Sequence, residues 1–384
     1  MIMKTGTRML RSMTRAMKVQ QRSVDKFVNN LFGLPKARPK TRQPALRPAP
    51  AQAPRNRPAP VSASLPAHLP GKWLTSYYAA MSAVGTMRRM SYCLYLADQA
   101  PPQSRALQSS AFQNHALPLI VMLHGCEQTA SEFAQGTRMN RLAERKGCAV
   151  LYPQQSFASH SYRCWKWFDK ATQQGGGDVT MIVGMIEHVA AKYAIDRSRI
   201  YLCGISAGAG MANIVALTHP YLIAALGLHS GPVFGAGHGT IGALSVMRNG
   251  TAGRPESAIA DILARNPQFP DMPTILIHGA DDTVVRPVNQ QQLVQQSLLL
   301  NRLPGDTVPT LQVTPARRPD SRNPVHAYAT RDFYAGKKLL IRATQIEQLG
   351  HAWSGGDASL SFNAKTGPDA SKMMLDFFVR HQRC

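Results

Sequence analysis

The chain has 384 residues with 44% apolar side chains, enough to fill the core of one large domain or two ordinary ones. No stretch approaches about eighteen uninterrupted apolar residues, which excludes a membrane-spanning helix. Six cysteines with no CxxC pair exclude a disulfide scaffold and argue against a zinc site.

The formal net charge is +23, and more than half of it lies near the N-terminus. Residues 1–70 hold 14 Lys and Arg side chains against one acidic residue, Asp25. A basic arm of this kind favours anionic surfaces such as nucleic acid, acidic lipid or a coated granule, and a solubilising tail is the simpler alternative. We expect contact with an anionic surface and no specific nucleic-acid binding.

The same region predicts two segments before the folded domain. Residues 1–34 can form a basic amphipathic helix, because their apolar side chains fall roughly on one stripe. Residues 35–72 contain ten prolines and predict an extended linker. We therefore expect a largely disordered arm in front of a catalytic domain over residues 73–384.

The N-terminus does not resemble a secretory signal. Arg or Lys interrupts residues 1–20 every three or four positions, whereas a signal needs an apolar core of about seven to fifteen residues. The sequence thus predicts a cytoplasmic protein. Secretion by a route not visible in the sequence is the alternative.

From residue 73 onward, predicted strands alternate with predicted helices, one of which Asp178 would cap. This alternation is typical of an α/β fold with a mostly parallel sheet and helices on both faces. Residues 232–271 show no usable periodicity. The predicted strands cover residues 90–97, 117–125, 148–153, 199–205, 222–231, 272–282 and 338–347, and the predicted helices cover residues 178–195, 209–219 and 370–382.

One serine stands between a predicted strand and a predicted helix, in the G-x-S-x-G pattern of residues 204–208. So tight a turn needs flanking residues that are nearly free of side chains, and it exposes the serine oxygen on a strained backbone. The helix that follows offers backbone N–H groups to a developing oxyanion. The pattern in this context predicts Ser206 as a catalytic nucleophile.

A serine hydroxyl needs a base to take its proton and an acid to orient that base. In alpha/beta-hydrolases the order along the chain is Ser, acid, His. His351 follows the last predicted strand, and Asp281 and Asp282 follow the strand before it. We predict His351 as the base and Asp282 as the acid, on its H-G-x-x-D spacing, with Asp281 as the rival.

Three other histidines also end apolar runs. His124 and His229 stand before the nucleophile or too soon after it to be the base in this order. His278 is expected to support the loop that carries the acid.

A second oxyanion donor is expected in the loop LHGCEQT (123–129), which follows the third strand. Gly125 lets this loop approach the site, so that the backbone N–H of Cys126 would pair with that of Ala207. The Cys126 side chain as nucleophile is the alternative. Cys126 and Cys164 both lie in loops expected near the site, and the sequence leaves open whether they are bridged.

Together these residues resemble the short-chain polyhydroxyalkanoate (PHB) depolymerase family of esterases, of the alpha/beta-hydrolase superfamily. The resemblance covers about residues 75–384, and GHAWSGG is its most specific motif. It implies an alpha/beta-hydrolase fold, the triad Ser206, Asp282 and His351, and the Cys126 amide in the oxyanion hole. The motifs are LHGCEQT (123–129), SYRCWKWFD (161–169), GISAGAGMA (204–212), HGADDTVV (278–285) and GHAWSGG (350–356).

The resemblance also implies that Trp165, Trp167 and Trp353 wall the ester cleft, and core filling is the alternative for each. Secreted members typically carry a signal peptide and a polymer-binding domain, neither of which this sequence shows. The sequence is therefore more similar to an intracellular member that acts on amorphous granules or soluble oligomers. The resemblance then implies that the basic arm holds the protein to a storage granule in the cytoplasm.

We predict a serine esterase that cleaves poly- or oligo-3-hydroxybutyrate esters through an acyl-enzyme, without a metal or organic cofactor. Because the family also includes feruloyl and acetylxylan esterases, a carbohydrate or small-molecule ester is the alternative substrate. A third hypothesis is a granule or polyanion tether with a vestigial hydrolase domain, which the intact triad opposes. The oligomeric state is left open.

Overall fold

The structure is a computed structural model that describes residues 69–81, 85–98, 116–317 and 325–383. The predicted helix over residues 1–34, and the predicted linker up to residue 68, lie outside the described residues. Both therefore remain predictions. None of the helices among the described residues is long and apolar enough to span a membrane.

The core of the fold is a ten-stranded sheet with the order β1-β2-β4-β3-β5-β6-β7-β10-β9-β8. Its six central strands are parallel to one another, which confirms the predicted sheet type. Every residue of β3, β4, β6 and β7 is buried, as expected for parallel strands covered on both faces. The central strands are β3 (Leu117–Leu123), β4 (Ala149–Pro153), β5 (Ile195–Ile205), β6 (Ala225–His229), β7 (Thr274–Gly279) and β10 (Lys338–Ile346).

Antiparallel strands complete the sheet at both edges. β1 (Lys72–Met81) and β2 (Met87–Leu96) form a hairpin on one side, and β9 (Tyr328–Ala335) and β8 (Thr310–Thr314) extend the other. Of these four strands, β2 was predicted from the sequence and β1, β8 and β9 were not.

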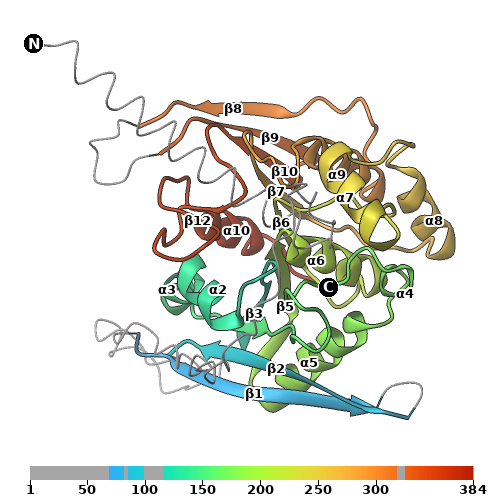
Figure 1. Ribbon diagram of the computed structural model, residues 1–384. Helices are drawn as coiled ribbons and strands as arrows, with labels where there is room; N and C mark the ends of the chain where they lie inside the picture. The colour runs from blue at the N-terminus through green and yellow to red at the C-terminus, as the bar shows by residue number, and fades with distance from the viewer. Residues whose placement is uncertain (1–68, 82–84, 99–115, 318–324, 384) are drawn as a thin grey trace, which may run out of the picture. The chain divides into compact units, whose positions relative to one another are not determined.

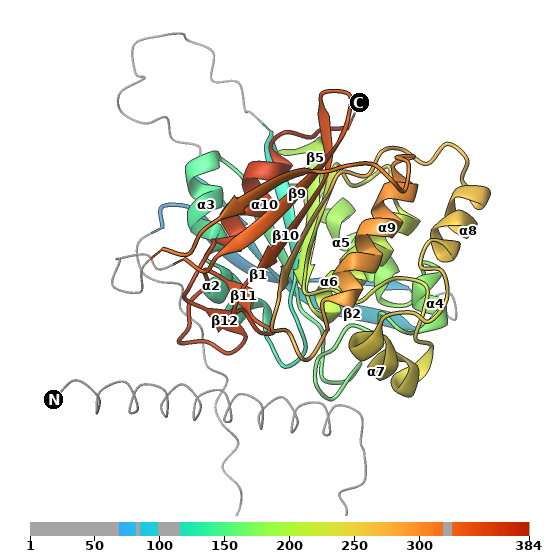
Figure 2. The ribbon, with the colours of Figure 1, turned by 90° about the horizontal axis from the view of Figure 1, so that it is seen from above.

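Helices cover both faces of the sheet, as predicted (Figures 1 and 2). One face carries α5 (Asp178–Lys192), α6 (Ala207–Thr218) and α9 (Val288–Leu300), and the other carries α2 (Ala130–Thr137), α3 (Met139–Lys146) and α10 (Ala370–Phe378). The short helix α4 (Lys170–Gln173) precedes α5, and β11 (Trp353–Ser354) pairs with β12 (Asn363–Ala364). The segment without periodicity forms α7 (Gly239–Asn249) and α8 (Ser257–Arg265), which pack beside α9.

The predicted capping role of Asp178 is wrong. The cap of α5 is Gly177, whose φ of 60° suits glycine, and Asp178 is the first helical residue. Its buried carboxylate instead accepts hydrogen bonds from Arg88 Nη2 at 2.9 Å and Gln155 Nε2 at 2.5 Å. Asp178 therefore ties α5 to the hairpin edge and to the segment after β4.

Candidate active site

Ser206 occupies the sharp turn between β5 and α6. Its φ of 56° is strained for a residue with a side chain, and its backbone N–H donates to His229 O at 2.9 Å. A Cβ at Gly204 would lie 2.5 Å from the Gly208 carbonyl carbon, and a Cβ at Gly208 would lie 2.1 Å from Leu123 O. Both glycines of the pattern are therefore required by close packing, as the sequence predicts.

Asp282 and His351 meet at the same edge of the sheet, in the loops that follow β7 and β10. His351 Nδ1 lies 2.8 Å from Asp282 Oδ2, and Asp282 Oδ1 accepts from the amides of Val284 and Val285 at 3.0 and 2.9 Å. The carboxylate is fully buried. Burial raises the pKa of Asp282, but the charge and hydrogen bond of His351 outweigh it and hold the pKa below its ordinary value.

His229 links the serine turn to the histidine loop. Its carbonyl accepts from Ser206, its Nε2 accepts from the Ser354 amide at 3.3 Å, and its ring stacks on Trp353 with 5.1 Å between centroids. Because β5, β6, β7 and β10 are consecutive in the sheet, their carboxyl ends bring the three predicted triad residues to one edge. In the described part of the chain, Ser206 Oγ forms no hydrogen bond, so the hydroxyl is free to meet a ligand.

The rival candidates are engaged elsewhere. His124 and His229 are fully buried, and burial lowers their pKa to about 4 and about 3, so both stay neutral near pH 7. His278 Nε2 lies 2.7 Å from Val285 O, which fits the predicted support of the acid's loop. Asp281 is exposed, while its backbone N–H donates to Leu349 O. Of the two acids, it is Asp282 that contacts His351.

The loop after β3 holds two of its backbone amides and leaves the one between them without an acceptor among the described residues. The Gly125 amide donates to Gln128 Oε1 at 2.8 Å, and the Glu127 amide donates to Tyr162 O at 2.7 Å. Among the described residues, the Cys126 amide between them has no acceptor, and neither has the Ala207 amide at the start of α6. The close contacts of Gly208 with Leu123 O and His124 O place the two loops side by side. This geometry fits the predicted oxyanion pair.

A disulfide joins Cys126 to Cys164 across 38 residues of sequence. The sequence left open whether these two cysteines are bridged, and the structure shows that they are. It also removes the thiol that the alternative nucleophile would need, because a bridged sulfur does not ionise. The bridge fastens the loop after β3 to the segment around residue 164.

The structure places the three tryptophans inside the protein. Trp165 Nε1 donates to His124 O at 3.0 Å, and Trp353 Nε1 donates to Ser371 Oγ at 3.1 Å. Both rings are almost completely buried, so a substrate would reach them only after neighbouring groups moved. Trp167 packs against Gly210 in the first turn of α6 and keeps a small exposed part. Contact of these rings with a substrate stays a prediction.

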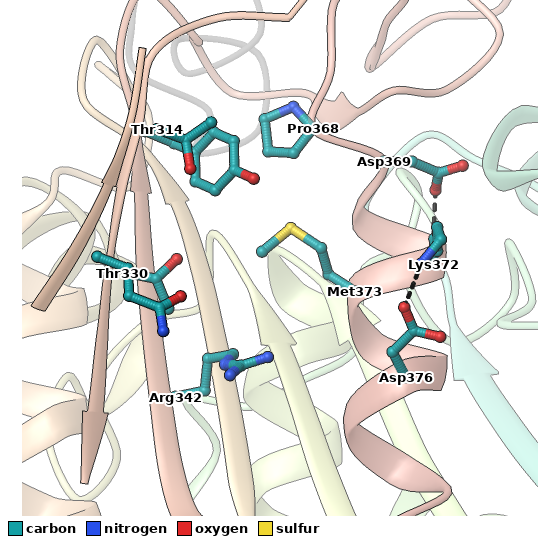
Figure 3. A pocket seen from close by; sticks show the side chains of 10 residues that line it. Thr314, Thr330, Arg342, Pro368, Asp369, Lys372, Met373 and Asp376 are labelled. Atoms are coloured by element: carbon teal, nitrogen blue, oxygen red, sulfur yellow. Dashed lines mark hydrogen bonds and ion pairs between the residues drawn. The ribbon is translucent and has the colours of Figure 1, made fainter. Parts of the chain in front are cut away.

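A cavity of about 300 Å³ lies between β8–β10 and α10 (Figure 3), and its lining includes none of the predicted site residues. Its two cationic side chains are already paired with carboxylates. Arg342 donates to Asp332 through Nε at 2.8 Å and Nη2 at 2.5 Å, and Lys372 pairs with Asp376. In the described residues, no group of three or more His, Cys, Asp or Glu side chains could hold a metal ion.

Two residues that hold the loop after β3 were not predicted from the sequence. Gln128 fixes the Gly125 amide, and Gln155 donates its backbone N–H to His124 Nε2 at 3.1 Å. Gln128 lies inside a quoted motif, three residues after Gly125, which is a usable signal for a side chain that reaches back to the backbone. Gln155 is 31 residues from its partner and carries no such signal.

The fold and the site define an alpha/beta-hydrolase. Among solved structures, an acetyl xylan esterase from Aspergillus awamori shares the fold, with a TM-score of 0.58 and 18% sequence identity. The match covers 79% of this chain and 99% of the esterase chain. A family model described as "Esterase PHB depolymerase" matches residues 90–320, and the chain belongs to that family. The predicted family is confirmed.

Curated relatives include both polyester and carbohydrate esterases. Poly(3-hydroxyalkanoate) depolymerase C of Paucimonas lemoignei is 33% identical over 47% of this chain and 44% of its own length. Feruloyl esterase B of Thermothelomyces thermophilus is 30% identical over 47% of this chain and 64% of its own length. A probable acetylxylan esterase A of Neosartorya fischeri is 29% identical over 46% of this chain and 50% of its own length. The chain thus spans about half the length of the curated relatives it matches.

Proposed function

We propose that the chain is a serine hydrolase that cleaves esters of 3-hydroxybutyrate, in polymer or oligomer form, through an acyl-enzyme. The observation that carries this proposal is the buried Asp282–His351 pair at the sheet edge where Ser206 stands on its strained turn. The similarity to Poly(3-hydroxyalkanoate) depolymerase C supports the choice of substrate.

In this proposal Ser206 Oγ attacks the ester carbonyl while His351 accepts the hydroxyl proton. Asp282 occupies Nδ1 of His351, which leaves Nε2 as the nitrogen that can accept the serine proton. Because the pKa of Asp282 is lowered, its carboxylate stays charged at neutral pH and stabilises the imidazolium that forms. The Ser206–His351 hydrogen bond forms when the substrate is bound, as is common for catalytic contacts.

The tetrahedral intermediate carries its negative charge on the former carbonyl oxygen, and the amides of Cys126 and Ala207 stabilise that charge. His351 then gives its proton to the leaving alcohol oxygen as the ester C–O bond breaks. Water next attacks the acyl-enzyme by the same steps, which frees the acid and restores Ser206.

An ester of a plant cell-wall carbohydrate, feruloyl or acetyl, is the second candidate substrate. The feruloyl and acetylxylan relatives support it at identities close to that of the polyester depolymerase. The chemistry at Ser206 would be the same, and both the acyl group and the alcohol of the ester would differ.

The experiment compares wild type, Ser206→Ala and the exposed control Ser257→Ala on amorphous poly-3-hydroxybutyrate granules, hydroxybutyrate oligomers, and feruloyl and acetyl esters. We expect release of 3-hydroxybutyrate by wild type and control, and none by Ser206→Ala. Ser206-dependent cleavage restricted to feruloyl or acetyl esters would overturn the substrate and keep the mechanism. Hydrolysis that survives in Ser206→Ala would overturn the mechanism.

For residues 1–70 we propose contact with an anionic surface such as a storage granule in the cytoplasm. The 14 basic side chains against one acid support this role. Deleting residues 1–70 should weaken granule association in a salt-dependent way while kcat on soluble esters is kept. Unchanged association at low salt would contradict the proposal.

A further inference from the structure

The segment that the disulfide fastens to the loop after β3 carries an arginine without an acidic partner. Residues 154–168 contain Arg163 and Lys166 but no Asp or Glu. In the described part of the chain, the Arg163 guanidinium makes no ion pair or hydrogen bond, and its Cζ lies 3.7 Å from the centroid of the Phe157 ring. Stacking uses the face of the guanidinium and leaves the N–H groups at its edge free for a ligand.

The disulfide places Arg163 close to the proposed oxyanion donor. The Cα atoms of Cys126 and Cys164 lie 4.3 Å apart. Because consecutive Cα atoms are about 3.8 Å apart, the Cα of Arg163 lies within about 8 Å of the Cα of Cys126. The pKa of His124, at the end of β3, is lowered to about 4, mainly by burial and in smaller part by the charge of Arg163. The cation therefore lies at the rim of the candidate active site.

The backbone of Arg163 has a conformation that would suit glycine. Its φ is 51°, which is uncommon for a residue with a side chain, and its N–H donates to His160 O at 2.8 Å to close the turn. Glycine would fit this turn without strain, so the arginine side chain points to a use of its own. That use is at the surface rather than in the core, because the Phe157 partner is 60% exposed.

A carboxylate is a ligand that the edge of a guanidinium recognises through paired hydrogen bonds. In a short hydroxybutyrate oligomer, the alcohol that leaves from the last ester bond carries the free carboxylate of the chain. We infer that Arg163 binds this terminal carboxylate, so that the protein favours short oligomers with a free acid end and releases 3-hydroxybutyrate from that end by hydrolysis. This inference rests on the proposed function.

The test compares the hydroxybutyrate dimer as the free acid with the same dimer as its neutral terminal carboxamide. Wild type should have the higher kcat/KM on the acid, and added salt should reduce this advantage. In Arg163→Met, kcat/KM on the acid should fall by about 5- to 30-fold, less than for a buried charge-assisted hydrogen bond because Arg163 is partly exposed. The loss should be in KM, since the carboxylate is bound equally before and during the reaction, and kcat/KM on the carboxamide should stay within about twofold.

Arg380→Met is the matched control, because Arg380 is exposed after α10, where the chain contacts the start of β5 and not its end. It should keep the wild-type ratio of acid to carboxamide. Arg163→Lys keeps the charge without the planar fork, so its ratio should lie between those of wild type and Arg163→Met, and it decides if Arg163→Met does not fold.

Equal losses on both dimers in Arg163→Met would mean that Arg163 only packs on Phe157, and they would overturn the inference. A wild type with no preference for the acid would also overturn it. The proposed function fails differently, by no cleavage of either dimer in wild type or by cleavage that survives in Ser206→Ala.

Discussion

The edge that carries Ser206 and the cavity between β8–β10 and α10 differ in how their polar groups are used. At the edge, the Ser206 hydroxyl and the amides of Cys126 and Ala207 are placed by the fold but have no partner among the described residues. In the cavity, Arg342 is paired with Asp332 and Lys372 with Asp376. Groups that are held in place and left unpaired can act on a ligand, whereas paired groups stabilise the fold. The volume of the cavity between β8–β10 and α10 is therefore no indication that it is the catalytic site.

The largest effect on turnover is expected from Asp282→Asn. The substitution removes the charge that orients His351 and stabilises its protonated form, so kcat should fall by about 10⁴-fold with little change in fold. The neighbouring Asp281→Asn is the matched control, and its turnover should stay within about twofold because Asp281 is exposed. Ester hydrolysis rates for the two variants measure this directly. A larger loss in Asp281→Asn would mean that the acid is wrongly assigned.

A moderate effect is expected from opening the disulfide with Cys126→Ser and Cys164→Ser together. The backbone amide of residue 126 remains, and Tyr162 and Trp165 still hold the loop, so kcat should fall by no more than about tenfold. Closing a 38-residue loop contributes roughly 3–4 kcal/mol of stability, which the variant should lose in urea unfolding. Cys93→Ser, at a free cysteine, is the control. Abolished turnover with an intact fold would restore the Cys126 side chain as a catalytic group.

Substitutions in the cavity between β8–β10 and α10 are expected to have no effect on turnover. Arg342→Met leaves the buried Asp332 carboxylate without its partner, and it should lower the free energy of unfolding by about 3–5 kcal/mol. Its kcat/KM on soluble esters should equal that of wild type. Adding Asp332→Leu removes the unpaired charge and should recover most of the stability. A selective loss of ester turnover in Arg342→Met would show that the two regions are not separate in function.

The central strands could be predicted from sequence because each is a short, nearly continuous apolar run. The strand β8 could not, since four of its five residues, TLQVT, are exposed. Gly239 and Gly242 weaken the helical signal of α7. α8 has no glycine, and its apolar Ile259 and Ile262, three residues apart, were a usable signal that was missed.

The candidate site was predictable where its signal is local. The serine turn needs small residues at fixed positions, and the acid and the base follow strands in a known order. The support of the loop after β3 was not predictable, because His124 meets Gln155 only once β3 and β4 are paired. The ordering of buried rings such as Trp165 and Trp353 also depends on packing between distant segments.

The most direct test of the account is to identify the residue that reacts with a fluorophosphonate, a reagent that labels activated serines. The full-length protein is treated with the reagent, digested, and mapped by mass spectrometry, with Asp282→Asn treated in parallel. We expect one adduct, on Ser206, formed much more slowly in the Asp282→Asn variant. An adduct on another residue, or continued ester hydrolysis by protein fully labelled at Ser206, would contradict it.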